Sequence, residues 1–225
     1  MQNIYSILLL DSDADLQGCL WHLCRAFVKK ARKLRLMRFR RVFPALFDII
    51  RMTCAIALLS KEYFPVGLDI VKNKAMETDI LIAYLLRPFF TYVERRWLNN
   101  ARRKEWMSLF NAPHRTTGFC ESHNRMLRKQ VGAYRPNVYL FIEALARLEH
   151  NASLDIEFMM EGGTVRRSRR CVSIYTDRQL AGLCNDLDMD IFHNLGETVS
   201  NFLSQASHLF HDSFNQHVER EGGRL

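Results

Sequence analysis

The sequence predicts a mainly α-helical protein folded as a helical bundle. In most of its longer segments, apolar residues recur every three or four positions, which is the period of one helix face. Prolines stand near the expected helix starts, at Pro44 and Pro65, where a missing N–H costs little. With 225 residues and 48% hydrophobic content, the chain can bury a sizeable core as one domain or two small ones. The run over residues 4–10 could pass for a short strand.

The first predicted helix covers residues 19–34 and is amphipathic. Its apolar positions form one stripe: Leu20, Leu23, Cys24, Phe27, Ala31 and Leu34. A second helix is expected over residues 43–59, with Pro44 in its first turn. A third begins near Pro65 and extends to about residue 74.

Further helices are predicted along the middle of the chain: residues 78–97, 99–111, about 117–131, and 136–150. Pro88 is expected to kink or divide the first of these, because proline removes a helical hydrogen bond. Gly132 fits the C-cap of the third.

A flexible basic linker is predicted around residues 162–170. Beyond it, residues 176–190 and 191–211 are expected to form an acidic helical hairpin. The predicted organisation is therefore a domain over 1–163, a linker over 164–176 and an acidic helical tail over 177–225.

The charge of the chain is uneven. The whole chain carries a net charge of +8, yet residues 177–225 hold eight acids and only three bases. Residues 25–51 hold ten bases and one acid. A polyanion, most naturally nucleic acid, is the predicted partner, and a solvated helix face is the alternative. The expected contacts on the first helix are Arg25, Lys29, Lys30, Arg32 and Lys33. The linker adds Arg166, Arg167, Arg169 and Arg170, as a phosphate contact or a nuclear-import patch.

The stretch over residues 115–124 begins a predicted helix with several polar side chains on one face. On a helix beginning near Thr117, four polar side chains share one face: Glu121, Asn124, Arg125 and Arg128. The opposite face carries Phe119, Cys120, His123, Met126 and Leu127. A carboxylate beside an amide and two guanidiniums suits a metal ion or a phosphate backbone. The alternative is a first-turn acid on a solvated face.

The order of these motifs carries a family resemblance. Gly18-Cys19-Leu-Trp-His22 is followed by a basic helix, an apolar helical block and then Tyr92-Val-Glu-Arg-Arg-Trp97. The 115–124 stretch comes next, and Arg135-Pro-Asn-Val-Tyr closes the series. This succession, over about residues 14–163, resembles the C-terminal half of Mutator-like element (MULE) transposases, which are DDE, RNase H-like recombinases.

The resemblance implies a fold and a site. The fold would be the helical insertion and the last catalytic helix of an RNase H-like transposase, with most of the sheet missing. In that family three acids bind two divalent metal ions for strand cleavage and joining. Glu121 matches the third acid, within a motif that here reads Thr116, Thr117, Ser122 and Asn124. Mg²⁺ or Mn²⁺ is expected only with an intact catalytic core.

The other two acids have no clear match. Cys19 follows only eighteen residues, so the first catalytic Asp is expected to be absent. Asp11, Asp13 and Asp15 sit too close to Cys19 for the family's second Asp. The chain is therefore expected to be a truncated derivative without an active catalytic site, in which Glu121 is a relic.

Cys19 and His22 match the family's C-x-x-H motif. Their i, i+3 spacing would let both bind one zinc ion, but two further ligands are needed. His114, His123, His208 and His211 are available, although none forms a diagnostic pair with them. A buried Cys19 beside a hydrogen-bonded His22 is the favoured interpretation. Burial is likewise expected for Cys120 and His123.

Six cysteines without paired spacing, and no secretory or transmembrane signal, predict an intracellular protein. The predicted nuclear-import patch over residues 166–170 makes the nucleus the expected compartment. The predicted function is DNA binding by a transposase-derived fragment. The alternative is a helical protein-interaction scaffold, domesticated from a transposase, whose acidic tail binds a protein partner or folds back on the basic half.

Overall fold

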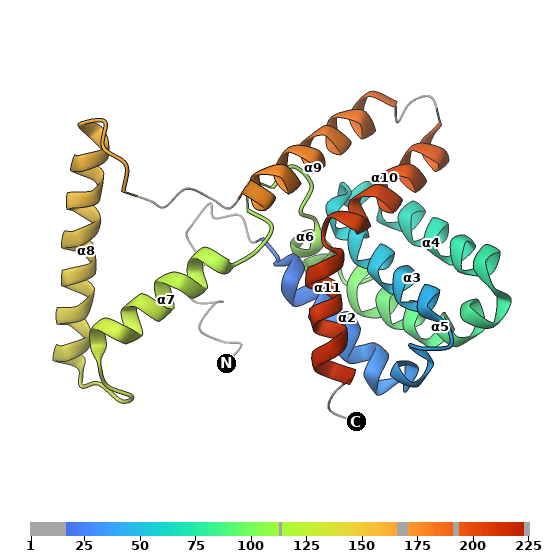
Figure 1. Ribbon diagram of the computed structural model, residues 1–225, viewed down its shortest axis with the longest axis horizontal. Coiled ribbons are helices and arrows are strands. Elements are labelled where there is room, and N and C mark those ends of the chain that lie inside the picture. The colour runs from blue at the N-terminus through green and yellow to red at the C-terminus, as the bar shows by residue number, and fades with distance from the viewer. Residues whose placement is uncertain (1–16, 113, 166–170, 191–193, 223–225) are drawn as a thin grey trace. The chain divides into compact units, whose positions relative to one another are not determined.

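The computed structural model describes residues 17–112, 114–165, 171–190 and 194–222 (Figure 1). Within these ranges the chain is helical, with ten α-helices and no strand, so the predicted all-α class is confirmed. The chain divides into two compact units. The core unit comprises Met1–Arg115 and Arg178–Leu225, and the hairpin unit comprises Thr116–Asp177. The strand-like run over residues 4–10 and the aspartates that follow it lie outside the described residues.

Helix α2 (Leu20–Lys33) matches the first predicted helix closely. Its buried residues are Leu20, Leu23, Cys24, Phe27, Val28 and Ala31. This set adds Val28 to the predicted stripe and lacks Leu34, which is the half-buried C-cap residue. Lys30, Arg32 and Lys33 occupy its last turn, where cations interact favourably with the helix dipole.

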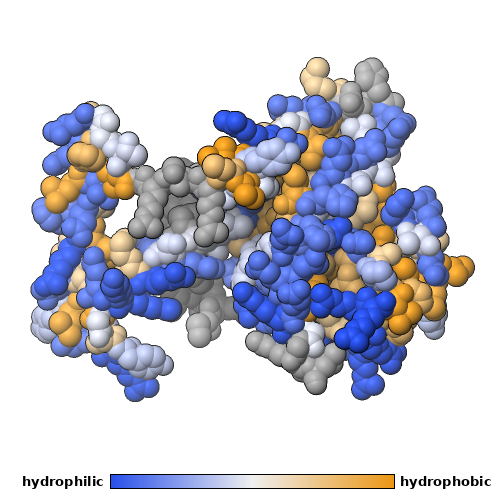
Figure 2. All heavy atoms as spheres, viewed as in Figure 1, coloured by the Kyte–Doolittle hydropathy of each residue, from blue (hydrophilic) through white to orange (hydrophobic). Residues whose placement is uncertain are grey.

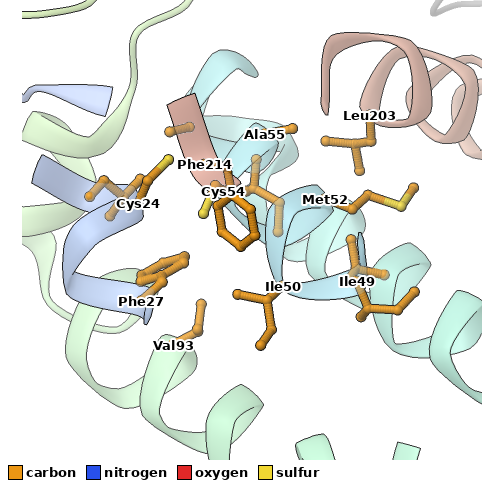
Figure 3. Packing of buried hydrophobic residues seen from close by; sticks show 14 of the residues in the cluster. Cys24, Phe27, Ile49, Ile50, Met52, Cys54, Ala55, Val93, Leu203 and Phe214 are labelled. Carbon is orange, nitrogen blue, oxygen red and sulfur yellow. The ribbon is translucent and has the colours of Figure 1, made fainter. Parts of the chain in front are cut away.

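Helix α3 (Pro44–Ala55) forms the centre of the core unit, and Pro44 lies in its first turn as predicted. Nearly every residue from Ile49 to Leu59 is buried, through α3 and the 3₁₀ turn η2 (Ile56–Leu58). Phe27 of α2, Ile50 and Cys54 of α3, and Phe214 of α11 (His211–Gly222) meet there (Figure 3). Helix α3 is therefore buried over most of its second half, while Asp48 in its first half is exposed.

Two further helices complete this part of the core unit: α4 (Phe64–Thr78) and α5 (Ile80–Val93). The Asp79 side chain caps α5 by accepting from the Leu81 N–H at 2.7 Å. The α-helix runs through Pro88, so of the predicted kink or division the division does not occur. Pro88 and Tyr84 are both exposed, so water can reach the Tyr84 carbonyl that proline deprives of its helical donor. The α-helical pattern instead ends at the π turn η4 (Glu94–Leu98).

The hairpin unit contains α7 (Gly118–Val131) and α8 (Val138–Met160). Gly132 adopts a left-handed conformation with φ of 67° and caps α7, as predicted. The Asn137 side chain caps α8 by accepting from the Leu140 N–H at 2.9 Å. Helix α8 runs ten residues beyond the predicted end at His150.

The C-terminal helices pack as part of the core unit. Helix α9 (Cys171–Asp190) crosses the boundary between the units, while α10 (Leu195–Leu209) packs on α3 and α4. Helix α11 packs on α2. Along the chain, the boundaries between the two compact units therefore fall at residues 115/116 and 177/178. The sequence-based division placed its boundaries at 163/164 and 176/177. No helix in the described ranges is long and apolar enough to cross a membrane.

Candidate nucleic-acid interface and the Glu121 segment

The predicted basic residues of α2 fall into two groups. Lys29 and Lys33 are exposed, one turn apart. Arg25 and Lys30 are half-buried because each cation lies over an aromatic ring, Trp21 at 5.5 Å and Tyr92 at 4.9 Å from the ring centroid. Lys29 and Lys33 are therefore the α2 cations most open to a polyanion.

Helix α11 places two carboxylates against this basic segment. Arg32 Nη1 lies 3.2 Å from Glu221 Oε2, and the Glu221 side chain is only 4% exposed. Arg40 Nη2 lies 3.7 Å from Glu219 Oε1 at the surface. Because Glu221 is buried, its ion pair with Arg32 is part of the packing of α11 on α2. Arg32 was predicted as a DNA contact, but it is already paired.

The turn after α2 adds exposed cations that the predicted site omitted. Arg35, Arg38 and Arg41 are all exposed, and Arg35 adopts a left-handed conformation with φ of 59°. The run of ten bases over residues 25–51 was the signal for them. Together with Lys29 and Lys33 they form the basic edge, the name used below for these five residues.

The Cys19 turn lies beside the segment that precedes α7. The Gly18 N–H donates to the Trp106 carbonyl at 2.8 Å, and the Leu20 N–H donates to the Arg115 carbonyl at 2.9 Å. A Cβ atom at Gly18 would lie 2.2 Å from the Trp106 carbonyl oxygen, so this close approach requires glycine. The backbone thus joins the start of the C-x-x-H motif to the start of the 115–124 stretch.

The C-x-x-H pair does not gather a metal-ligand set among the described residues. Cys19 is half-buried at the N-cap of α2, and His22 is exposed with its ring 4.9 Å from that of Trp21. Nowhere in the described ranges do three or more His, Cys, Asp or Glu side chains come together as a metal would require. The expectation that Cys19 is buried is met only in part.

Glu121 lies in the first turn of α7 and is exposed. Its backbone N–H donates to the Thr117 carbonyl at 3.0 Å, and the Thr117 hydroxyl donates to Glu121 Oε1 at 3.5 Å. Asn124, Arg125 and Arg128 are exposed further along the helix. Thr116 is exposed in the preceding turn. Since the register of α7 places these polar groups on one side, they could contact phosphate oxygens together.

Two residues of α7 differ from the prediction. Cys120 and His123 are both exposed, although they were expected on a buried apolar face. Within the hairpin unit α7 packs on α8, and this packing covers neither Cys120 nor His123. Among the predicted linker cations, Arg166, Arg167, Arg169 and Arg170 lie outside the described residues.

A buried histidine under the basic segment was not anticipated. His217 of α11 is 2% exposed, and its ring lies 4.6 Å from that of Trp21. Its Nε2 atom has no hydrogen-bond partner among the described residues. Burial lowers the pKa of His217 below its ordinary 6.5, and the nearby Arg220 and Arg25 lower this pKa further. No spacing in the sequence pairs His217 with Trp21, because the contact depends on how α11 packs.

A second surface feature is an open pocket of about 460 Å³ between α4 and α5. Met76, Ile80 and Tyr84 give it an apolar lining, and Arg87 stands at its edge. Lys72 forms an ion pair with Glu94 beside it. The sequence contains no motif that marks this pocket.

No protein-family model, curated protein or solved structure matches this chain. The resemblance to Mutator-like transposases therefore rests on the sequence motifs.

Proposed function

We propose that this chain is a transposase-derived DNA-binding protein of the nucleus, and that the basic edge contacts the phosphate backbone. The observation that carries the proposal is the exposure of five cations within thirteen residues, Lys29, Lys33, Arg35, Arg38 and Arg41. Cations that remain exposed on a folded surface can replace the counterions condensed on duplex DNA. Such contacts position the protein on DNA without reading its sequence.

The polar face of α7 supplies the second proposed contact. Arg125 and Arg128 lie one turn apart and are exposed, with Asn124 beside them. Guanidinium groups bind phosphate oxygens in bidentate fashion, and the amide adds a further hydrogen-bond donor. Under this proposal the two units each contribute one cationic surface.

Binding is proposed to occur without strand cleavage, and Glu121 is proposed to be the relic of a third catalytic acid. Two-metal catalysis needs several acids around one pair of ions. The described residues place no such group around Glu121. Incubation with supercoiled plasmid and Mg²⁺ or Mn²⁺ should leave the plasmid intact. Nicking that Glu121→Gln abolishes would contradict this part of the proposal.

Fluorescence anisotropy with a labelled duplex tests the binding itself. The chain should bind with a steep salt dependence, and Lys29→Gln/Lys33→Gln should weaken binding uniformly across sequences. The same pair should lower the slope of log K against log salt by about two, because each lysine is expected to neutralise about one phosphate. Lys74→Gln is the matched control, because Lys74 is exposed on α4 and lies 3.6 Å from Glu77. Absence of binding at low salt would contradict the proposal.

A protein-interaction scaffold is the second candidate function. The observation that favours it is the apolar surface of α8, where residues such as Val138, Ile142 and Met160 are exposed. Pull-down of a stable protein partner, together with no DNA binding at low salt, would favour the scaffold over DNA binding.

A further inference from the structure

The apolar surface of α8 lies outside the proposed DNA contacts and supports a separate inference. Only Ala144 and Leu148 of this 23-residue helix are buried. Val138, Ile142, Leu145 and Ile156 lie along one side of the helix and are 40% to 61% exposed, and the exposed Glu149 interrupts this side between Leu145 and Ile156. Hydrophobic side chains are visible on the surface of α8 in Figure 2. We call these four residues the α8 stripe.

The second half of α8 extends beyond α7, and its Phe158 ring lies against Gly163 of the turn that follows the helix. Helix α7 has 14 residues and packs near the loop that joins it to α8, beyond which the two helices diverge (Figure 1). Every residue from Asn151 to Met160 is exposed, including Leu154, Phe158 and Met159. A helix that shows this much apolar surface to water gains stability when another surface covers it.

The charges on the hairpin unit are complementary between its two ends. Asp155, Glu157 and Glu161 are exposed near the C-terminal end of α8, which has no basic residue in its last turn. Acids there interact unfavourably with the dipole of their own helix. Lys129 and Arg135 are exposed at the other end, close to where α8 begins. One unit therefore carries the apolar stripe, an acidic end and a basic end.

We propose that a second copy of this chain covers the α8 stripe in a twofold, antiparallel contact between the two α8 helices. A twofold contact requires a self-complementary surface, and the oppositely charged ends of the unit have this property. The two Glu149 carboxylates would meet near the middle of the contact, where their repulsion opposes association. Antiparallel packing brings the acids of one α8 beside the partner's Lys129 and the partner's Arg135. It also sets these acids beside the positive N-terminal end of the partner helix, which relieves the unfavourable dipole interaction. The inference does not depend on DNA binding.

Light scattering on the full chain tests the proposal. A dimer has twice the 26.4 kDa mass of the chain. Ile156→Asp should raise the dissociation constant by about tenfold or more, because it places a charge within the apolar contact. Tyr84→Asp is the matched control, since Tyr84 is 71% exposed on α5 in the core unit. Circular dichroism should show unchanged helix content in both variants. Equal loss of dimer in both variants would overturn the proposal.

Charge-reversal variants distinguish self-association through the α8 stripe from binding of a different partner to it. One chain would carry Asp155→Lys, Glu157→Lys and Glu161→Lys, and a second chain would carry Lys129→Glu and Arg135→Glu. Each alone should be mainly monomeric at low salt, and their mixture should form a heterodimer, because opposite charges then face each other in both copies. A monomeric wild-type chain at about 100 μM would overturn the proposal. So would a mixture that stays monomeric.

Discussion

The core unit and the hairpin unit are both helical, but different interactions hold them. In the core unit, helices from both ends of the chain bury their apolar side chains in one cluster around α3 (Figure 3). In the hairpin unit, α8 buries two residues, and its helical order rests on the Asn137 cap and the Arg147–Glu143 ion pair at 2.6 Å. Exposed pairs of this kind contribute only a few tenths of a kcal/mol. The core unit is therefore stabilised mainly by packing between helices that are distant in sequence. The hairpin unit is stabilised mostly by interactions within each helix.

The largest expected effect comes from removing a core aromatic. Phe27 is fully buried, and its ring lies 5.6 Å from that of Phe89 and 5.8 Å from that of Trp97. Phe27→Ala should lower the free energy of unfolding by about 3–5 kcal/mol, because it leaves a cavity. Tyr134→Ala in the hairpin unit should change it by less than about 0.5 kcal/mol, since Tyr134 is 97% exposed. Urea denaturation measures both, and similar losses would contradict the contrast between units.

An intermediate effect is expected from pH, through the buried His217 of the core unit. The pKa of His217 is lowered in the folded state by burial and then by Arg220 and Arg25. The unfolded chain therefore takes up a proton before the folded chain does. Stability should be unaffected by His217 well above pH 6.5 and should fall as pH drops below 6.5 toward the lower folded pKa.

The loss in that window should not exceed about 1.4 kcal/mol per pH unit. The groups that face His217 are Arg25, Arg220, Glu221 and His22. Urea denaturation of the wild type and of His217→Gln between about pH 5 and 8 isolates the contribution of His217 to stability. The free energy of unfolding of the variant should depend less on pH. Identical profiles would show that His217 does not titrate differently on folding.

The smallest expected effect is the loss of an asparagine N-cap, which can be compared between the two units. Asn137 caps α8, and Asn100 caps α6 (Ala101–Met107) by accepting from the Arg103 N–H at 3.0 Å. Each Asn→Ala change should cost about 1 kcal/mol. In the core unit this loss should lower global stability, because α6 is anchored by buried Met107.

In the hairpin unit the loss should be local instead. Hydrogen exchange in the first turn of α8 should become faster, while the denaturation midpoint of the core unit stays unchanged. A shift of that midpoint in Asn137→Ala would mean that the two units unfold together.

Local pattern was enough to predict most helices and part of the candidate site. The period of Leu20, Leu23 and Phe27 defined the buried face of α2, and Gly132 marked the end of α7, because both depend on neighbours in sequence. The exposure of Lys29 and Lys33 follows from the same period. Local pattern also predicted that Glu121, Asn124, Arg125 and Arg128 share one side of a helix.

Tertiary packing decided the rest, because it joins residues that no local spacing relates. Arg32 is paired because Glu221 reaches it from α11, and His217 is buried because that helix packs on Trp21. His123 is exposed because the packing of α7 on α8 does not cover it, although its helical position suggested burial. A helix face becomes core only when another surface covers it, so the sequence alone determined the faces of the helices and the packing chose which of them are buried.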